Sequence, residues 1–182
     1  HKPNVADRND NYHKIMSKLS FAERYSDDIK QSEMDLGYVS VDSHDLVFFF
    51  GDLNYRLEFD DRASVLRLIE QQEWSALLAK DQLLMQQQDK KAFDGFQEKE
   101  IEFQPTYKFV VGKNEYDALK GRMPSWCDRV LWKNNMTENI ARRSATGSKK
   151  VECTEYDIVM DECLSDHKPV VALFHLQHQM YL

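Results

Sequence analysis

Hydrophobic residues near the start of the chain recur at helical spacing. Between residues 7 and 20, Tyr12, Ile15, Met16 and Leu19 fall three or four positions apart or adjacent, which places their side chains on one face of a helix. The polar residues between them would then face the solvent. This pattern predicts an amphipathic helix over residues 7–20.

The middle of the chain carries two further helical patterns. The first would begin after Asp60 or Asp61, because either carboxylate can cap the N-terminus of a helix. Its apolar side is formed by Val65, Leu66 and Ile69. A leucine-rich stretch over residues 74–84 predicts more helix, which fades in the polar residues 86–91.

Strands are predicted where β-branched and aromatic residues form short runs. The most apolar run, residues 47–50, ends at Gly51 and predicts a buried strand. Short strands are also predicted at 101–103 and 107–111, on either side of Pro105. Further strands are predicted at 130–132, 156–160 and 170–176. Helices and strands alternate without an internal repeat or a dividing linker, which predicts a single α/β or α+β domain.

The composition agrees with one folded domain and bears on its partners. The chain has 182 residues, 42% of them hydrophobic and 12% aromatic, which is enough for a core and excludes a disordered chain. The net charge is −7, with 24 Lys and Arg against 31 Asp and Glu. Nucleic-acid-binding proteins usually show a basic surface, so no nucleic acid partner is expected. A local basic patch remains compatible with this balance.

The cysteines and the hydropathy favour a reduced, cytoplasmic protein. The chain has three cysteines without CxxC spacing, so the sequence does not predict a zinc site. Disulfides are rare in the cytosol, and an odd number of unpatterned cysteines fits that compartment. No apolar run approaches the ~20 residues of a membrane span, and no signal peptide is visible.

The predicted strand at 47–50 ends in polar residues that could carry chemistry. Side chains alternate between the two faces of an extended chain, so Asp52 and Asn54 are expected to project together, with Leu53 packed behind them. An acid and an amide in this position can hold a water, a metal ion or a phosphate oxygen. The alternative is an ordinary turn, because Asp and Asn are common turn residues.

A second polar group lies in residues 121–132, where Asp128 and Arg129 stand between apolar neighbours. One interpretation is a structural salt bridge between acidic and basic residues. The other uses Arg129 or Arg122 as a forked hydrogen-bond donor to phosphate.

The third polar group, Asp166 and His167, precedes the predicted strand at 170–176. A histidine beside an acid can transfer a proton or present a positive charge to an anion, although an isolated Asp-His pair is also common in structural roles. The three groups contain no serine or cysteine paired with a base, and Cys127 would face away from its polar neighbours. This set favours metal-assisted attack by water over covalent catalysis.

Four segments, in this order along the chain, resemble those of one enzyme family. They are GDLNYR at 51–56, PTYKF at 105–109, PSWCDRVLW at 124–132 and SDHKPV at 165–170. Together they resemble the inositol polyphosphate 5-phosphatases, and similarity at 8–15 and 80–109 extends the match over nearly the whole chain. The resemblance implies an α/β (α+β) fold: the four-layer DNase I-like sandwich of two face-to-face β-sheets flanked by helices.

The resemblance also implies that residues 1–182 are the C-terminal part of a single 5-phosphatase catalytic domain. Family members carry an asparagine motif and a glutamate motif further upstream, and that glutamate is the main magnesium ligand. We therefore expect the main ligand upstream of His1. Within these 182 residues, Asp166 is expected to be a minor metal ligand at most.

The family's motifs assign roles to the matching positions of this sequence. Asp52 would orient or deprotonate the attacking water, and Asn54 would hydrogen-bond the phosphate. His167 would bind a non-bridging phosphate oxygen, helped by Asp166. The substrate-binding residues that the resemblance implies are Arg56, Tyr107, Lys108, Lys120, Arg122, Asp128, Arg129 and Lys168. Asp128 and Arg129 are expected in the supporting shell, and Tyr107, Lys108, Lys120 and Arg122 at the 4-phosphate.

The expected reaction is Mg²⁺-dependent hydrolysis of the 5-phosphate of a phosphoinositide headgroup or a soluble inositol polyphosphate, by in-line attack of water. The protein is expected to be cytoplasmic and peripheral to membranes. The segment ARRSATGSKK at 141–150 could approach a membrane or be a solvated loop. Two alternatives stay open: a nuclease of the same superfamily, and a non-catalytic fragment or interaction module without the upstream metal ligand.

Overall fold

The first helix lies where the hydrophobic spacing predicted it. The computed structural model describes residues 4–22, 38–119, 121–135 and 151–177. Helix α1, Val5–Lys18, begins after Asn4, whose side-chain oxygen accepts a hydrogen bond from the Ala6 amide at 3.1 Å. Tyr12 and Met16 pack into an apolar cluster on one side of the helix. The predicted loop segment 141–150 and Lys120 lie outside the described residues.

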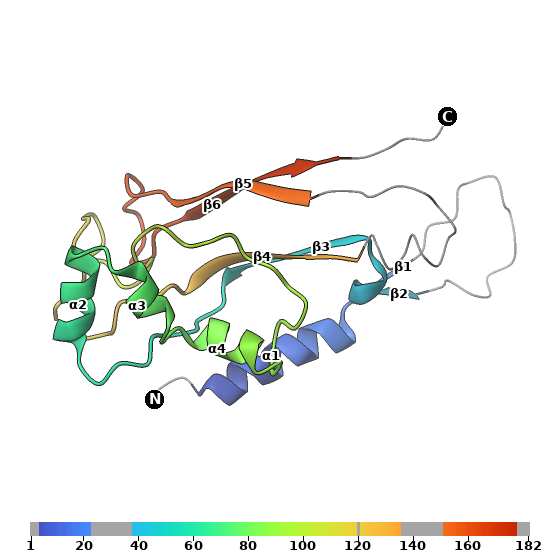
Figure 1. Ribbon diagram of the computed structural model, residues 1–182, viewed down its shortest axis with the longest axis horizontal. Coiled ribbons are helices and arrows are strands. Elements are labelled where there is room, and N and C mark those ends of the chain that lie inside the picture. Colours follow the sequence, from blue (N-terminus) through green and yellow to red (C-terminus); the bar gives the residue numbers. More distant parts are fainter. Residues whose placement is uncertain (1–3, 23–37, 120, 136–150, 178–182) are drawn as a thin grey trace, which may run out of the picture.

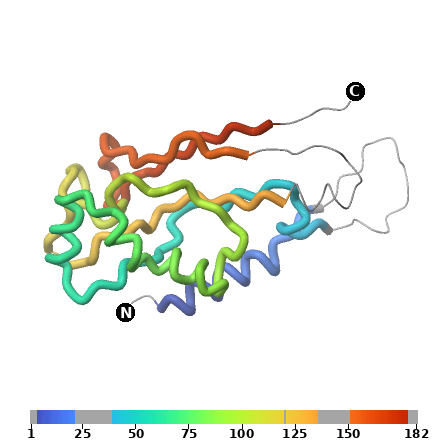
Figure 2. The backbone as a smooth tube through the Cα atoms, in the orientation of Figure 1, coloured from blue at the N-terminus to red at the C-terminus, as the bar shows by residue number. Residues whose placement is uncertain are grey.

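The strands form three antiparallel pairs (Figure 1). The pairs are β1, Ser20–Ala22, with β2, Tyr38–Ser40; β3, Leu46–Asp52, with β4, Asp128–Asn134; and β5, Val151–Ile158, with β6, Val170–Leu176. A short 3-10 helix, η1, Val41–Ser43, leads from β2 toward β3. The β5–β6 pair lies over β3–β4, and helix α1 runs along the opposite side of β3–β4 (Figures 1 and 2).

Two apolar clusters hold these layers together. Between α1 and the β3–β4 pair, the rings of Tyr12, Phe49 and Phe93 meet with centroid distances of 4.1–5.8 Å. Between the two strand pairs, Trp132 and Phe174 meet edge to face at 5.2 Å. These clusters pack α1 against one side of the β3–β4 pair and the β5–β6 pair against the other. The predicted mixed α and β architecture is confirmed.

The central helices are shorter than their leucine pattern suggested. Helix α2, Arg62–Glu70, is capped by Asp61, which accepts from the Ser64 amide at 2.7 Å. The stretch predicted at 74–84 is divided into α3, Trp74–Leu78, and α4, Gln82–Gln88. Asp81 starts the second of these because its side chain accepts from the Leu84 amide at 3.1 Å. Among the described residues, no helix combines the length and apolar character needed to cross a membrane.

The predicted strands at 101–103 and 107–111 are wrong. These residues form only isolated bridges, such as Tyr107 with Ser125 and with His167. Their backbone groups bond to loops instead: the Phe109 amide donates to the Asp166 carbonyl at 2.9 Å. Pro105 supplies no amide donor for a continuous ladder. The apolar side chains of the two segments are nevertheless largely buried, so the pattern indicated burial and not strand.

Two other strand predictions need correction. Strand β3 was predicted to be buried, but Phe48 is exposed and the Phe50 side chain is 70% exposed. Burial alternates along the strand because Val47 and Phe49 face the apolar cluster beside α1, whereas Phe48 and Phe50 point to the opposite face. The strand predicted at 156–160 begins earlier, at Val151, and ends at Ile158. Strand β6 has the predicted bounds.

Candidate functional site

The polar ends of three segments meet at one end of the β3–β4 pair. The register of the pair places Asp52, the last residue of β3, directly opposite Asp128, the first residue of β4. His167 comes from the loop that precedes β6 and is held beside them by its bridge to Tyr107. Its Nδ1 lies 2.9 Å from Asp128 Oδ2, and its Nε2 lies 4.0 Å from Asp52 Oδ2.

Asp52 and Asn54 point together, but the backbone achieves this by a turn. Asn54 has a φ of 60°, a left-handed conformation that asparagine adopts more readily than most residues. The turn lets both Asp52 oxygens accept hydrogen bonds, from the Asn54 amide nitrogen and from its Nδ2, each at 3.0 Å. The pairing predicted from strand alternation is confirmed, although its cause is different.

Asp128 orients the ring of His167. Besides the imidazole, its Oδ2 accepts the hydroxyl of Thr106 at 2.6 Å, so this carboxylate is held between two donors. The hydrogen bond with Asp128 raises the pKa of His167; burial opposes this, while the charges of Asp128, Asp52 and Asp166 add to it. Burial also raises the pKa of Asp52, against the lowering effect of His167.

Asp166 supports His167 through its charge, but it is not the hydrogen-bond partner of the ring. Asp166 forms an ion pair with Lys108, which lowers the pKa of the Asp166 carboxyl chiefly through that hydrogen bond. The orienting partner of His167 is Asp128 instead. The sequence could not distinguish the two acids, because Asp166 adjoins His167 in the chain and Asp128 meets it only in the fold. Thr106 was missed altogether, since no pattern marked its hydroxyl.

Two residues predicted to bind substrate are buried and already paired. The guanidinium of Arg129 is fully buried and forms ion pairs with Asp81 at 2.9 Å and Glu98 at 2.6 Å. Lys168 is also fully buried. Its Nζ lies within hydrogen-bond distance of four acceptors, which share its three N–H groups: Asn114 Oδ1 at 2.5 Å and the Met160 carbonyl, the Glu162 carbonyl and Cys163 Sγ at 2.9 Å each. Arg129 thus lies in the supporting position that was expected for it, whereas Lys168 is corrected from a substrate contact to an internal supporting position.

The other predicted substrate residues lie at different distances from the cluster. Tyr107 contacts it directly, since its ring centroid is 4.6 Å from that of His167 and 4.2 Å from the Arg56 guanidinium. Lys108 joins through its ion pair with Asp166. Arg122 is exposed, on the segment that follows Gly121. Cys127 is fully buried, which raises the pKa of its thiol and removes it as a nucleophile.

Asp52, Asp128 and His167 also form a group that fits a divalent cation. Each offers one ligand atom, and these atoms lie within 4.8 Å of one another. Carboxylate oxygens are the ligands that hard divalent cations prefer, and imidazole is accepted by several transition metals. His167 Nδ1 is engaged by Asp128, which leaves Nε2 on the side of Asp52. This donor set includes Asp52 and Asp128 in place of the predicted Asp166.

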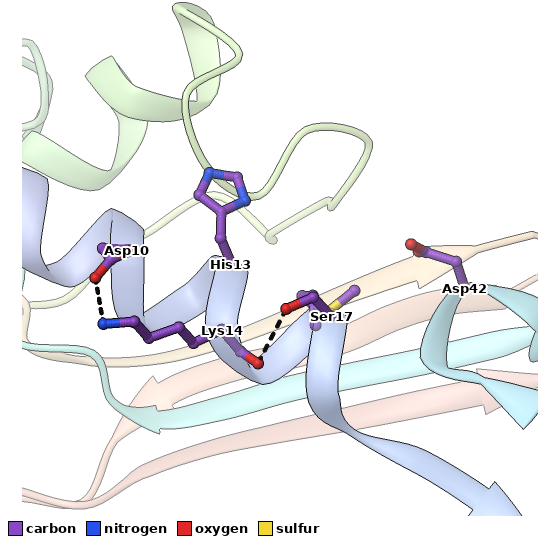
Figure 3. Close-up of a pocket in the computed structure, with 6 residues that line it drawn as sticks. Asp10, His13, Lys14, Ser17 and Asp42 are labelled. Atoms are coloured by element: carbon purple, nitrogen blue, oxygen red, sulfur yellow. Dashed lines mark hydrogen bonds and ion pairs between the residues drawn. The ribbon is translucent and has the colours of Figure 1, made fainter.

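A separate pocket of about 460 Å³ lies beside helix α1 (Figure 3). It is lined by Asp10, His13, Lys14, Met16, Ser17 and Asp42. The charged groups at its rim have protein partners: Lys14 pairs with Asp10 at 2.5 Å, and Asp42 with Lys133 at 2.8 Å. The pocket shares no residue with the cluster around His167. Because the charged groups at its rim are already paired, we assign the chemistry to the His167 cluster.

The ion pair with Asp128 raises the pH at which His167 loses its positive charge. Because the pKa of His167 is raised in the folded protein, the pair contributes full stability below the unfolded value of about 6.5. That stability is lost as pH rises through the folded pKa. We expect Asp128→Asn to lower the pKa of His167, as measured by NMR of isotope-labelled histidine rings in metal-free full-length protein.

Asp42→Asn is the matched control, because Asp42 pairs with Lys133 and not with a histidine. It should leave the titration of His167 unchanged. If Asp128→Asn also left that pKa unchanged, Asp128 would not be the partner that holds the charge on the ring.

Comparisons with known proteins are consistent in family and fold. Residues 1–173 match the endonuclease/exonuclease/phosphatase family 2. The chain is 36% identical over 170 residues to the type II inositol 1,4,5-trisphosphate 5-phosphatase of Mus musculus, covering 93% of this chain and 15% of that protein. It is 37% identical over 180 residues to the phosphatidylinositol 4,5-bisphosphate 5-phosphatase A of Homo sapiens, covering 97% and 17%. The chain thus spans about a sixth of these relatives.

Solved structures give the same fold. The inositol polyphosphate 5-phosphatase domain of SPsynaptojanin, in complex with inositol (1,4)-bisphosphate and a calcium ion, has a TM-score of 0.73 and 31% identity, over 94% of this chain and 42% of that one. Cimex nitrophorin, as its ferrous NO complex, has a TM-score of 0.64 and 29% identity, over 85% and 53%. Since one fold serves both proteins, the side chains at the site must decide the function.

Proposed function

The chain belongs to the endonuclease/exonuclease/phosphatase family, as the match over residues 1–173 shows, and we propose that it serves the hydrolysis of the 5-phosphate of phosphoinositides or inositol polyphosphates. The observation that carries this proposal is the convergence of Asp52, Asn54, Asp128 and His167 at one end of the β3–β4 pair. The names of the relatives support the substrate class, because they act on inositol phosphates or on phosphatidylinositol phosphates.

The reaction would use these side chains in separate roles. Asp52 is a carboxylate whose pKa is raised by burial, which makes it a better acceptor for the proton of an attacking water. Asn54 keeps one N–H of its amide beyond the hydrogen bond to Asp52. That N–H and Nε2 of His167 would donate to the phosphate oxygens, where negative charge grows during the reaction.

Mg²⁺ is the cofactor that we propose. The carboxylates of Asp52 and Asp128 are the described groups that would hold it, while His167 keeps its N–H groups for Asp128 and the phosphate. When bound, it would neutralise charge on the phosphoryl oxygens. Asp128 would also keep His167 oriented, so the phosphate would meet a fixed donor whether the substrate is a lipid or a soluble inositol phosphate.

We propose that the protein acts in the cytoplasm, at a membrane surface, when its substrate is a lipid. Three strongly exposed hydrophobic side chains support this: Val111, Leu119 and Leu164 are 62%, 98% and 91% exposed, and Leu164 lies three positions before His167. The loops that carry Val111 and Leu164 are joined by a hydrogen bond from the Gly112 amide to the Cys163 carbonyl at 2.8 Å. Exposed apolar side chains beside a headgroup site are suited to contact with lipid.

The test is a comparison of substrates with the full-length protein. We expect Mg²⁺-dependent release of phosphate from phosphatidylinositol 4,5-bisphosphate vesicles or inositol 1,4,5-trisphosphate, and no cleavage of plasmid DNA. A chelator should abolish the release, and added Mg²⁺ should restore it. Cleavage of DNA without release of phosphate would favour the nuclease alternative, and inactivity on all substrates would favour a non-catalytic role.

A further inference from the structure

Arg56 stands behind the site and touches two of its residues. Its Nη2 donates to the side-chain oxygen of Asn54, and its guanidinium carbon lies 4.2 Å from the centroid of the Tyr107 ring. The backbone is held as well, because the Arg56 amide donates to Gln82 Oε1 at 3.0 Å. The side chain is half-buried, and within the described part of the chain its buried Nε has no hydrogen-bond partner.

The hydrogen bond from Arg56 determines which way the Asn54 amide faces. An asparagine amide has an acceptor end and a donor end. The Oδ1 end receives the guanidinium, and the Nδ2 end donates to Asp52 Oδ2 at 3.0 Å. If the amide were flipped, its Oδ1 would face the Asp52 carboxylate and its Nδ2 would face the Arg56 guanidinium. Arg56 and Asp52 together therefore select one orientation.

This orientation limits what Asn54 can offer to a ligand. Its carbonyl is engaged by Arg56, and one N–H is engaged by Asp52. The group that remains is the second N–H of Nδ2, which is a donor. This N–H can bind an acceptor, such as a phosphate oxygen. The carbonyl oxygen keeps a second lone pair, but a cation bound there would lie beside the positive charge of Arg56.

The same guanidinium supports the ring of His167 through Tyr107. The Tyr107 ring lies between the two, with its centroid 4.2 Å from the Arg56 guanidinium carbon and 4.6 Å from the His167 ring centroid. A planar guanidinium stacks on an aromatic face in a way that a lysine ammonium cannot reproduce. Arg56 thus contacts Asn54 directly and His167 through the Tyr107 ring.

We propose that Arg56 is a positioning residue, which holds the Asn54 amide in its donor-outward orientation and supports the contact between the Tyr107 and His167 rings, and that it is not a contact for substrate phosphate. This inference rests on the proposed 5-phosphatase function. It departs from the substrate-binding role that the sequence motif implied for Arg56. A positioning residue acts on the rate of the chemical step, whereas a phosphate contact acts on substrate affinity.

The kinetic test separates these two roles in the full-length protein. We expect Arg56→Met to lower kcat about 10- to 100-fold, the scale of a misplaced reacting group, with KM for inositol 1,4,5-trisphosphate changed less than about twofold. Arg56→Lys keeps the charge but loses the fork and the stack, so it should recover little activity. Arg67→Met is the matched control, because Arg67 is an exposed arginine of α2 whose side chain donates to Ser64. A raised KM with an unchanged kcat would overturn the proposal.

A double-mutant cycle tests the route through Asn54. If Arg56 acts mainly on Asn54, Arg56→Met in an Asn54→Ala background should cost much less than in the wild type. Additive losses would contradict that route. Low millimolar guanidinium should also raise the kcat of Arg56→Ala by several-fold, which loss of folding alone would not allow.

Neutron crystal structures of the full-length protein and its Arg56→Met variant give a readout that needs no turnover, because they distinguish the amide nitrogen of Asn54 from its oxygen. The Asn54 amide should turn or occupy two orientations in the variant, while Asp52 stays in place. An unchanged Asn54 would overturn the inference even if the protein proved to be an active phosphatase. A turned Asn54 in a protein that hydrolyses no inositol phosphate would retain the geometric inference and reject the proposed function.

Discussion

His167→Ala and Asp52→Ala should each lower the turnover of a 5-phosphate substrate by at least about 100-fold, the cost of removing one preorganised group from such a site. His167 is held by Asp128 at 2.9 Å, so its ring meets the phosphate without a further search for the right geometry. Asp52 lies 4.0 Å from His167 Nε2, where a water can be placed between the carboxylate and the phosphate. Steady-state release of inorganic phosphate by the full-length variants measures the loss.

Matched substitutions outside the cluster serve as controls for this first prediction. His175 is an exposed histidine of β6, and Asp60 is an exposed residue before α2. Replacing either with alanine should leave turnover within about twofold of the wild type, because surface changes away from a site rarely matter. Near-wild-type turnover by His167→Ala or Asp52→Ala, with an intact fold by circular dichroism, would contradict the assigned roles.

Arg129→Met should lower the free energy of unfolding by about 3–5 kcal/mol, the usual cost of removing one partner from a buried ion pair. The guanidinium donates to Asp81 and to both oxygens of Glu98, at 2.6–2.9 Å. Burial lowers the pKa of Arg129, but the charges of Asp81 and Glu98 outweigh it and raise that pKa overall, so the group stays charged. Without it, two buried carboxylates would remain with fewer donors. Urea denaturation of the full-length protein and the variant measures the change.

The exposed ion pair of Lys91 and Asp89 is the control for this second prediction. Its length, 2.7 Å, is similar, but its side chains are 60% and 53% exposed. Lys91→Ala should therefore cost less than about 1 kcal/mol. A loss below about 1 kcal/mol for Arg129→Met as well would mean that the buried network does not hold β4 in place. Both variants remove the cation of an ion pair, so the difference between their losses of stability measures the effect of burial.

The sequence predicted elements well where local spacing matched the final environment. Helix α1 and strand β6 have nearly the predicted bounds, because one face of each packs on the core along its length. The segment 101–111 was misassigned because most of its apolar side chains, such as Ile101, Phe103 and Phe109, are buried in loops, and burial alone does not distinguish a loop from a strand. Phe50 was wrongly expected in the core for a similar reason. A run of apolar residues does not show which face of the strand another element covers.

The sequence by itself determined which chemical groups this protein has near its strand ends. Asp52, Asn54 and His167 were all found from motifs, because each follows or precedes an apolar run at a fixed offset in the chain. Only the tertiary structure decided how these groups are paired. Asp128 and His167 are 39 residues apart, and Arg129 reaches Asp81 across 48 residues. Such partners are selected by strand register and loop packing, which are properties of the whole fold and leave no local pattern in the sequence.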